Sequence, residues 1–389
     1  MIFKSGFPNA PDVTIVLDGA SVDYLSIESI IVDVSENKHD MALVTFSGLP
    51  AKAITDYVGV PVSITISVSA SRYMAFNGYV SYVEPEAISR RGLVNNSQVQ
   101  KAVVHCFGAS YSMVETKNKV WENVTLLNVV ESLANKYNLS YSIPEDSFIW
   151  TRLLQTEQSD WSFLVNACSS LGYMVTLNKT HIHVYDIYKA IARNMPYANL
   201  FNIKGADNNP QYYPGRIMEF HGTFGDRTPD GSSDNYKIVG IDSYGQPVSV
   251  NTSDLESSGF GESVSARYTN EITTNVSSLS MLNKIAKSIT RYRYPFNAKV
   301  ITTGLPEPLP GSLVRVAEYD SYFDGYWVVR GIKHIVTRAS YISELEISTD
   351  STNKEQPTVN PVTPYVEPVE TALVDGKWYA SSVGGSAYA

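Results

Sequence analysis

The sequence predicts a mainly β protein of the α+β class, with two antiparallel, tube-like β-barrels, a small two-helix α+β module between them, and a loop-rich insertion. Three observations predict this architecture. Apolar and polar residues alternate with period two in both residues 13–112 and residues 297–349. Helical spacing is scarce in the first of these regions and is found mainly in short segments outside both of them. The chain has 389 residues, a length greater than a single hydrophobic core usually serves, and 43% of the residues are hydrophobic, which is enough to form several cores.

Residues 1–115 are expected to form the first barrel. Their alternation runs through about six strand-length segments, namely VTIVL, SIESIIVDVSE, MALVTFSG, VPVSITISVS, YMAFNGYVSYVE and KAVVHCFGASYS. Turn-forming residues such as Asp18-Gly19 and residues 36–38 separate these segments. The best candidate for a helix in this region is the short segment PAKAITDYV. Six short antiparallel strands at this spacing predict a barrel or a sandwich.

Residues 116–190 are expected to form the small α+β module, which begins with a helix in NVTLLNVVESLANKYNLSY. Its apolar residues recur at helical spacing, at Leu126, Val130, Leu133 and Tyr137. Thr125 is placed to cap its N-terminus, and Asn138 can close its C-terminus.

A second helix is expected over residues 160–171, capped by Ser159 or Asp160 and ended by Gly172. YMVTL and HIHVYD then alternate around residues 178–180, which predicts a hairpin. Both helices are too short to be stable alone in water. Each must therefore bury its apolar stripe against the hairpin or the neighbouring barrel.

The rest of the chain divides by composition. Residues 191–225 and 295–350 are expected to form the second barrel. Residues 226–294 form the loop-rich insertion, with strands at YKIVGID and QPVSV and a helix over residues 277–293 that Pro295 ends. Residues 351–389 are spaced by prolines and end in Gly, Ser and Ala, which predicts an extended tail that could reach a partner.

Charge and hydropathy exclude several classes of function. Lys and Arg total 30 against 39 Asp and Glu, a net charge of −9, and no run of five like charges occurs. Nonspecific binding to nucleic acid requires clustered Lys and Arg side chains, which this sequence lacks, so nucleic acid is not an expected ligand. An acidic wall past which DNA only slides is compatible with this composition. No membrane span is expected, because 18 successive apolar residues occur nowhere, and Pro8 and Pro11 interrupt any signal-peptide pattern. Cys106 and Cys168 lie in apolar sequence, typical of buried free thiols.

His181 and His183 are the most conspicuous candidate metal ligands. They share one face of a predicted strand, with their rings about 7 Å apart. They could share a zinc ion only with further ligands, and no clear third ligand lies nearby. Partly exposed strand histidines are the favoured interpretation, so no metal is expected. The other histidines stand singly, at His39, His105, His221 and His334.

Carboxylate pairs and phosphate loops give no stronger signal. Glu145 and Asp146 cannot be ranked as a glycosidase pair by spacing, and Glu157 is expected to be a cap-region acid. Residues 320–325 resemble a calcium loop only faintly and lack its terminal glutamate, so a hairpin turn is favoured. Nucleophile-elbow, zinc-protease and nucleotide-loop motifs are absent from the sequence. We therefore expect no catalytic or cofactor-binding residue, no cofactor, and no enzymatic activity.

Three segments carry a resemblance to a known family. They are NVTLLNVVESLANKYNL; LLQTEQSDWSFLVNACSSLGYMVTL, with Gln155, Ser159, Asp160, Phe163 and Leu164 in a Gln-x-x-x-Ser-Asp-x-x-Phe-Leu pattern; and LPGSLVRVAEYDSYFDGYWVVRGIKHIV. In this order, over roughly residues 10–350, the chain resembles the baseplate or tail hub family of tailed phages. Late control D proteins and the hub part of type VI secretion spike proteins are related to that family.

The resemblance implies a homotrimer in which the two barrels of each chain alternate in a pseudo-sixfold ring. Such a ring would join the sixfold tail tube, or a distal tail protein, above it to a threefold spike, fibre or tail tip protein below it. A tape measure protein would be a further partner, and DNA would pass through the lumen during ejection without specific binding. The protein would be a virion component assembled in the host cytoplasm. The alternatives are a carbohydrate- or receptor-binding tail module and a carboxylate-based cell-wall hydrolase.

Overall fold

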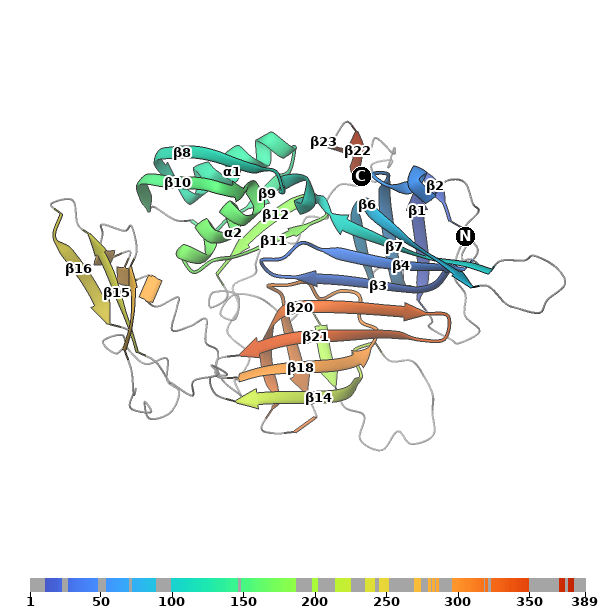
Figure 1. Cartoon of the computed structure of the whole chain (residues 1–389). Helices are drawn as coiled ribbons and strands as arrows, with labels where there is room; N and C mark the ends of the chain where they lie inside the picture. The colour runs from blue at the N-terminus through green and yellow to red at the C-terminus, as the bar shows by residue number, and fades with distance from the viewer. Residues whose placement is uncertain are drawn as a thin grey trace, which may run out of the picture.

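The computed structural model describes residues 11–22, 27–47, 54–69, 72–88, 99–145, 148–186, 198–201, 214–224, 235–241, 245–251, 269–273, 279–280, 282–283, 285–286, 296–317, 319–320, 323–349, 371–374 and 377–380. Figure 1 shows a large curled sheet, with two helices and short strands packed beside one end of it. A smaller group of strands lies farther out on the same side.

Within the described residues the large sheet has 13 strands, which we group into two halves. The first half contains β1 (Asp12–Leu17), β2 (Ala20–Ser21), β3 (Ile27–Ser35), β4 (Met41–Ser47), β5 (Pro61–Ser69), β6 (Arg72–Ile88) and β7 (Val99–Gly108), with the short 3-10 helix η2 (Ile54–Tyr57). The second half contains β13 (Ala198–Phe201), β14 (Ile217–Phe224), β18 (Phe296–Thr303), β19 (Leu313–Ala317), β20 (Gly325–Thr337) and β21 (Tyr341–Thr349). Nearly all neighbours are antiparallel, so the mainly β fold class is confirmed.

The two halves are joined by a ladder between β3 and β20, which we call the seam. The ladder runs from the pair Ser29 and Thr337 to the pair Ser35 and Gly331. A single cluster of buried side chains extends across it, from Val32 and Val44 in the first half to Leu345 in the second. The strands of the two expected barrels therefore belong to one continuous sheet. The expected domain boundaries stay a prediction.

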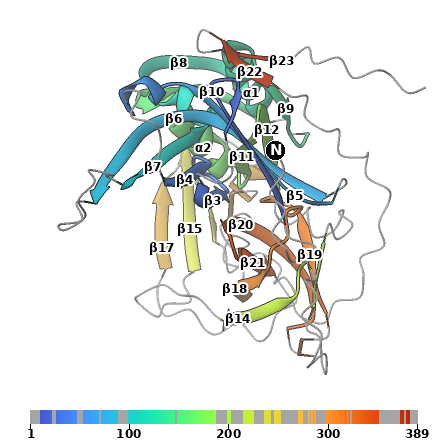
Figure 2. The same ribbon diagram turned by 90° about the vertical axis from the view of Figure 1, so that its right-hand side faces the viewer.

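Residues between the halves form a compact unit, which we call the module. It contains the 3-10 helix η3 (Ala109–Met113), the ribbon of β8 (Thr116–Thr125) and β10 (Ile149–Ser159), the helices α1 (Leu126–Tyr137) and α2 (Asp160–Ser170), and the sheet of β9 (Ser140–Ser142), β11 (Met174–Asn178) and β12 (His181–Tyr185). In Figure 2 the ribbon curves over the helices. Its buried side chains form a second cluster, which Ile238, Val250, Leu282, Ile285 and Ala286 of the insertion join.

The expected caps of both helices are confirmed. The side chain of Thr125 accepts a hydrogen bond from the backbone N–H of Asn128, and Asn138 ends α1 in the left-handed conformation with φ 54°. Ser159 accepts from the N–H of Ser162 at the start of α2. Gly172 follows α2 with φ 77°, which lets the chain reverse into the β11–β12 hairpin.

The insertion contributes a small sheet of β15 (Asn235–Ile241), β16 (Pro247–Asn251) and β17 (Thr269–Thr273). Both strands expected there are confirmed, and helix is present at the described residues between 279 and 286. Beyond residue 370 the described residues form a hairpin of β22 (Thr371–Val374) and β23 (Lys377–Ala380). In the described part of the chain, no helix combines the length and the apolar character needed to cross a bilayer.

Candidate functional site

The turn between β3 and β4, residues 36–40, contacts all three parts of the protein, and we call it the junction turn. Its sequence is ENKHD. Asn37 adopts φ 58°, a left-handed conformation that asparagine tolerates better than most residues. Four of its five residues form the contacts described below, with the second half, the module, or the end of β7. The turn is therefore the place where the relative positions of these parts are fixed.

Glu36 contacts the second half and the module at once. Its backbone N–H donates to the carbonyl of Arg330 at 3.0 Å, one step beyond the end of the seam. Its carboxylate forms an ion pair with the Arg330 guanidinium, and the Tyr185 hydroxyl donates to the same carboxylate at 3.1 Å. The two charged side chains are only 11% and 18% exposed, so water screens this pair less than a surface pair.

Asn37 binds β11 of the module as a strand neighbour would. Its N–H donates to the Val175 carbonyl at 2.8 Å, and the Val175 N–H donates to its Oδ1 at 3.0 Å. Beside it, Met174 and Tyr185 of the module pack with Leu313 and Val328 of the second half in a small buried cluster. The module is thus attached to the second half by apolar burial as well as by hydrogen bonds.

His39 attaches the turn to η3 and α2 of the module, and Asp40 attaches it to the end of β7, where the Gly108 N–H donates to the Asp40 carbonyl at 2.8 Å. The His39 Nδ1 lies 2.8 Å from the Ser110 hydroxyl, and its ring lies 5.6 Å from the Trp161 ring. Burial lowers the pKa of His39. Asp40 is 6% exposed, and its Oδ1 has no hydrogen-bond partner in the described part of the chain. Burial, with a smaller contribution from Asp33, raises the pKa of Asp40 well above its ordinary value.

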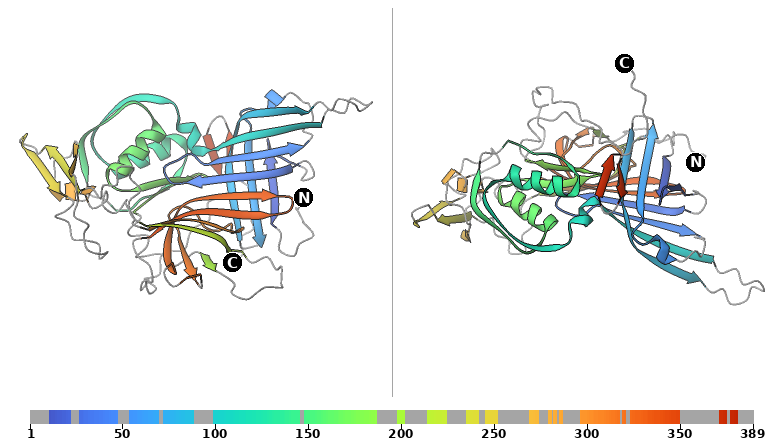
Figure 3. Two further views of the ribbon diagram at one scale, coloured as in Figure 1. Left: turned by 60° about the horizontal axis from the view of Figure 1, so that its bottom comes forward. Right: turned by 90° about the horizontal axis from the view of Figure 1, so that it is seen from above.

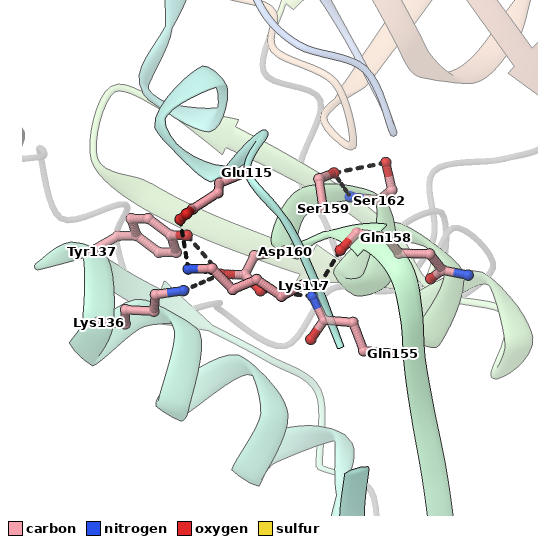
Figure 4. Close-up of polar contacts among 9 residues, drawn as sticks. All are labelled: Glu115, Lys117, Lys136, Tyr137, Gln155, Gln158, Ser159, Asp160 and Ser162. Atoms are coloured by element: carbon pink, nitrogen blue, oxygen red, sulfur yellow. Dashed lines mark hydrogen bonds and ion pairs between the residues drawn. The ribbon is translucent and has the colours of Figure 1, made fainter. Parts of the chain in front are cut away.

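A second buried polar cluster lies inside the module, around Asp160 (Figure 4). Asp160 is 2% exposed at the start of α2. Gln155 of β10 donates to its Oδ1 at 2.8 Å, Tyr137 of α1 donates to its Oδ2 at 2.6 Å, and Lys136 forms an ion pair with the same oxygen. Lys117 of β8 lies 3.9 Å away. One carboxylate therefore links both helices and both strands of the ribbon.

The environment of Asp160 keeps it ionised. Burial by itself would raise its pKa, but the hydrogen bonds from Gln155, Lys136 and Tyr137 outweigh burial and lower the pKa of Asp160. A charged carboxylate enclosed by donors suits a structural role, because a general acid needs a raised pKa and access to a substrate.

The histidine pair lies where the sequence placed it, on one face of β12, with ring centroids 6.4 Å apart. Serines of β9 form hydrogen bonds with the ring nitrogens: the Ser140 hydroxyl lies 2.8 Å from His181 Nδ1, and the Ser142 hydroxyl lies 2.7 Å from His183 Nδ1. Burial, followed by the neighbouring His181, lowers the pKa of His183 to about 4. No group of three or more potential ligands for a metal ion occurs among the described residues. The pair forms a neutral ladder with the two serines.

The other residues considered from the sequence lie apart from one another. Cys106 and Cys168 are buried and free, as expected. Glu145 is exposed, Asp146 lies outside the described residues, and Glu157 occupies an irregular position of β10 with φ 51°. Asp324 accepts hydrogen bonds from the N–H groups of Tyr319 and Asp320, which is typical of a turn. His105 stacks on Tyr82 with centroids 4.0 Å apart, and His221 is exposed.

Comparisons with known proteins bear on the fold. A family described as the Alg8 N-terminal domain matches residues 59–195, less than half of the chain. That span begins just before β5 and so omits β1 and β4, with which the matched strands β5 and β7 pair. It therefore outlines no folding unit of this structure. No curated protein matches the chain.

Several solved structures match nearly the whole chain. The tail protein from Neisseria meningitidis MC58 has a TM-score of 0.65 and 13% identity, and the match covers 90% of this chain and 100% of that one. The 43 kDa tail protein of prophage MuSo2 from Shewanella oneidensis has a TM-score of 0.62 and 13% identity, with 88% and 99% covered.

A third similar structure is an E. coli component of the type VI secretion system, described as similar in structure to the T4 bacteriophage tail proteins gp27 and gp5. It has a TM-score of 0.54 and 11% identity, with 87% of this chain and 78% of that chain covered. At these identities the likeness concerns the fold. The resemblance inferred from the sequence is confirmed at that level: this chain has the fold of phage tail proteins.

Proposed function

We propose that the protein is a structural component of a phage tail tip or baseplate, in which three copies form a hub ring around the DNA channel. The observation that carries the proposal is the seam. Four long strands lie in succession on each side of it, β14, β18, β21 and β20 in the second half and β3, β4, β7 and β6 in the first. One chain thus supplies two comparable curved surfaces side by side.

This duplication suits an adaptor between two symmetries. Three copies related by a threefold axis would present six such surfaces, three from each half, to a sixfold tube. The same ring remains threefold toward a spike, fibre or tail tip protein. The tail tube or distal tail protein, the tape measure protein and the virion location follow as parts of the proposal. The net charge of −9 suits a lumen that lets DNA pass without binding it.

Ring closure requires an edge strand of the sheet, and β14 is one among the described residues. It ends the strand order there and pairs with β18. Its Met218 lies at an irregularity in the β14–β18 ladder and is 55% exposed. An unpaired edge strand readily accepts a strand from another chain. We assign this edge to the contact between neighbouring copies, a heterologous contact that closes into a ring.

The acids in the described residues support a structural role over a hydrolase. Glycoside hydrolysis requires one carboxylic acid with a raised pKa and a second carboxylate, both facing a substrate. Asp40 has the raised pKa but is enclosed at 6% exposure, whereas Asp160 has a lowered pKa and contacts side chains of three other elements, α1, β8 and β10.

The test of the ring is the mass of the purified protein across a concentration series, with imaging of the particles. We expect a trimer with a central hole. Met218→Lys places a charge at the proposed contact, and we expect it to weaken trimer formation about tenfold or more. Ile149→Lys is the matched control, because Ile149 is 56% exposed on β10 of the module and lies outside the proposed contact. Equal weakening by both substitutions, or none by Met218→Lys, would remove β14 from the interface.

A further inference from the structure

The module contacts the sheet on both sides of the seam. On the first-half side, η3 continues directly from β7, and His39 of the junction turn packs against Trp161 of α2. On the second-half side, Tyr185 and Met174 pack with Leu313 and Val328. Figures 1 and 3 show β11 and β12 beside the end of the β3–β4 hairpin, where the two halves meet. The module therefore spans the joint between the halves.

Tyr185 is the main contact with the second half. It is 5% exposed, and its ring lies against Gly311, where a Cβ would be 2.9 Å from the ring carbon Cζ. Gly311 has φ 87°, and its N–H donates to the Val329 carbonyl at 2.8 Å. A side chain at residue 311 would therefore both strain the backbone and displace the ring.

Glu36 links this contact to the end of the seam. Its carboxylate binds Tyr185 of the module and Arg330 of β20 at the same time. Arg330 lies at the irregularity in β20, where that strand stops pairing with β3 and begins pairing with β19. The strands on either side of the seam separate at this position, so the contact lies where bending between the halves would have its largest effect.

We propose that the module is a brace that sets the curvature of the sheet across the seam, with Glu36, Arg330 and Tyr185 as its positioning residues. The proposal rests on the hub ring proposed above. If each copy contributes one seam to the ring, a change in bending at the seam alters the angle between the two edges through which that copy meets its neighbours. Three copies then no longer meet at a closing angle.

The experiment measures the seam in the single chain, before any ring forms. Spin labels at Val58→Cys in the first half and Met218→Cys in the second report the distance between the halves by pulsed electron resonance. Both positions are more than half exposed. The native cysteines are buried, and burial raises the pKa of the Cys106 thiol to about 12, so they react slowly with the label. The label at Met218 lies in the proposed contact, so we expect it to weaken trimer formation, as Met218→Lys does.

We expect a narrow distance distribution in the parent protein. Tyr185→Ala should broaden it at least about twofold, and Tyr185→Phe and Glu36→Gln, which keep the ring packed, should broaden it less. Glu344→Gln is the matched control, since it removes an ion pair on the same sheet whose Lys299 side chain is 52% exposed. The two mild variants keep the test decisive if Tyr185→Ala unfolds. An unchanged distribution in all three brace variants would overturn the proposal.

The mass experiment separates this inference from the ring itself. With Met218 restored, Tyr185→Phe and Glu36→Gln should give a mixture of trimers and open or larger assemblies if the brace sets the closing angle. A parent protein that never forms a ring refutes the hub proposal, whatever the spin labels report. A parent ring with uniform trimers in every brace variant refutes the brace alone.

Discussion

Asp160→Asn is expected to lower the free energy of unfolding by about 3 kcal/mol at pH 7, because it removes the buried charge that Lys136 neutralises and turns an amide toward three donors. The loss is placed at the lower end of the range for buried pairs because the Lys136 side chain is 39% exposed and can return to water. Urea unfolding of the parent and the variant, followed by tryptophan fluorescence, measures the difference.

Glu115→Gln is the control for Asp160→Asn. Glu115 also pairs with Lys117, at 2.9 Å, but its side chain is 75% exposed. Water screens such a pair, so no measurable loss is expected. Because the pKa of Asp160 is lowered in the fold, its contribution is present above the ordinary aspartate pKa and is lost as the pH falls through the folded value. Equal losses from both substitutions would show that burial of Asp160 carries no special weight.

The second large effect is expected from His334 in acid. This residue of β20 is fully buried beside the seam, with Nδ1 3.0 Å from the Tyr341 hydroxyl and 3.3 Å from the Ser343 hydroxyl. Its Nε2 has no partner among the described residues, and burial lowers the pKa of His334 to about 3. Between about pH 6.5 and 3, His334 is therefore protonated in the unfolded chain but neutral in the folded protein. Each pH unit below 6.5 should lower the free energy of unfolding by about 1.4 kcal/mol, which amounts to about 2 kcal/mol at pH 5.

His334→Asn tests this effect by its slope rather than by its absolute stability, since the smaller side chain leaves a cavity. The free energy of unfolding, measured from pH 7.5 to 5, should fall less steeply in the variant. His183 acts in the same direction as His334, whereas Asp40, whose pKa is raised, contributes stability below pH 3.8 that is lost as the pH rises. Both remain in the variant, so the difference in slope isolates His334. His221→Asn, at an exposed position of the same half, should leave the slope unchanged; a parallel slope in His334→Asn would refute the assignment.

The elements that the sequence predicted are those whose signals are local. The cap at Thr125 and the left-handed stop at Asn138 lie within one turn of the helix that they bound. The period-two alternation of β3 and β4 reflects one buried face, which each strand encodes by itself. The histidine pair was interpreted from strand geometry alone, and its spacing in the structure agrees with that geometry.

The pairing of the halves and the junction turn could not be predicted, because their partners are distant in sequence. Arg330 and Glu36 are separated by 294 positions, and although Arg330 lies in a segment that carries the family resemblance, nothing in that segment points to Glu36. Residues 36–38 were recognised only as a turn, which is true of many surface loops. The one available hint was the density of polar and charged residues in ENKHD, and that pattern is equally typical of a solvent-exposed turn.

The seam also has a consequence for how the protein is synthesised. β3 lies between β4 and β20 in the sheet. In the sequence, however, β20 comes near the end of the region that forms the sheet. A nascent chain can complete the hairpin of β3 and β4 early, yet one edge of β3 stays unpaired until translation has passed Thr337. Contacts of such sequence separation form slowly, and an open strand edge can pair with other chains in the meantime. The first half therefore leaves the ribosome before the second edge of β3 is paired, and the pairing of β3 with β20 joins the two halves in a late folding step.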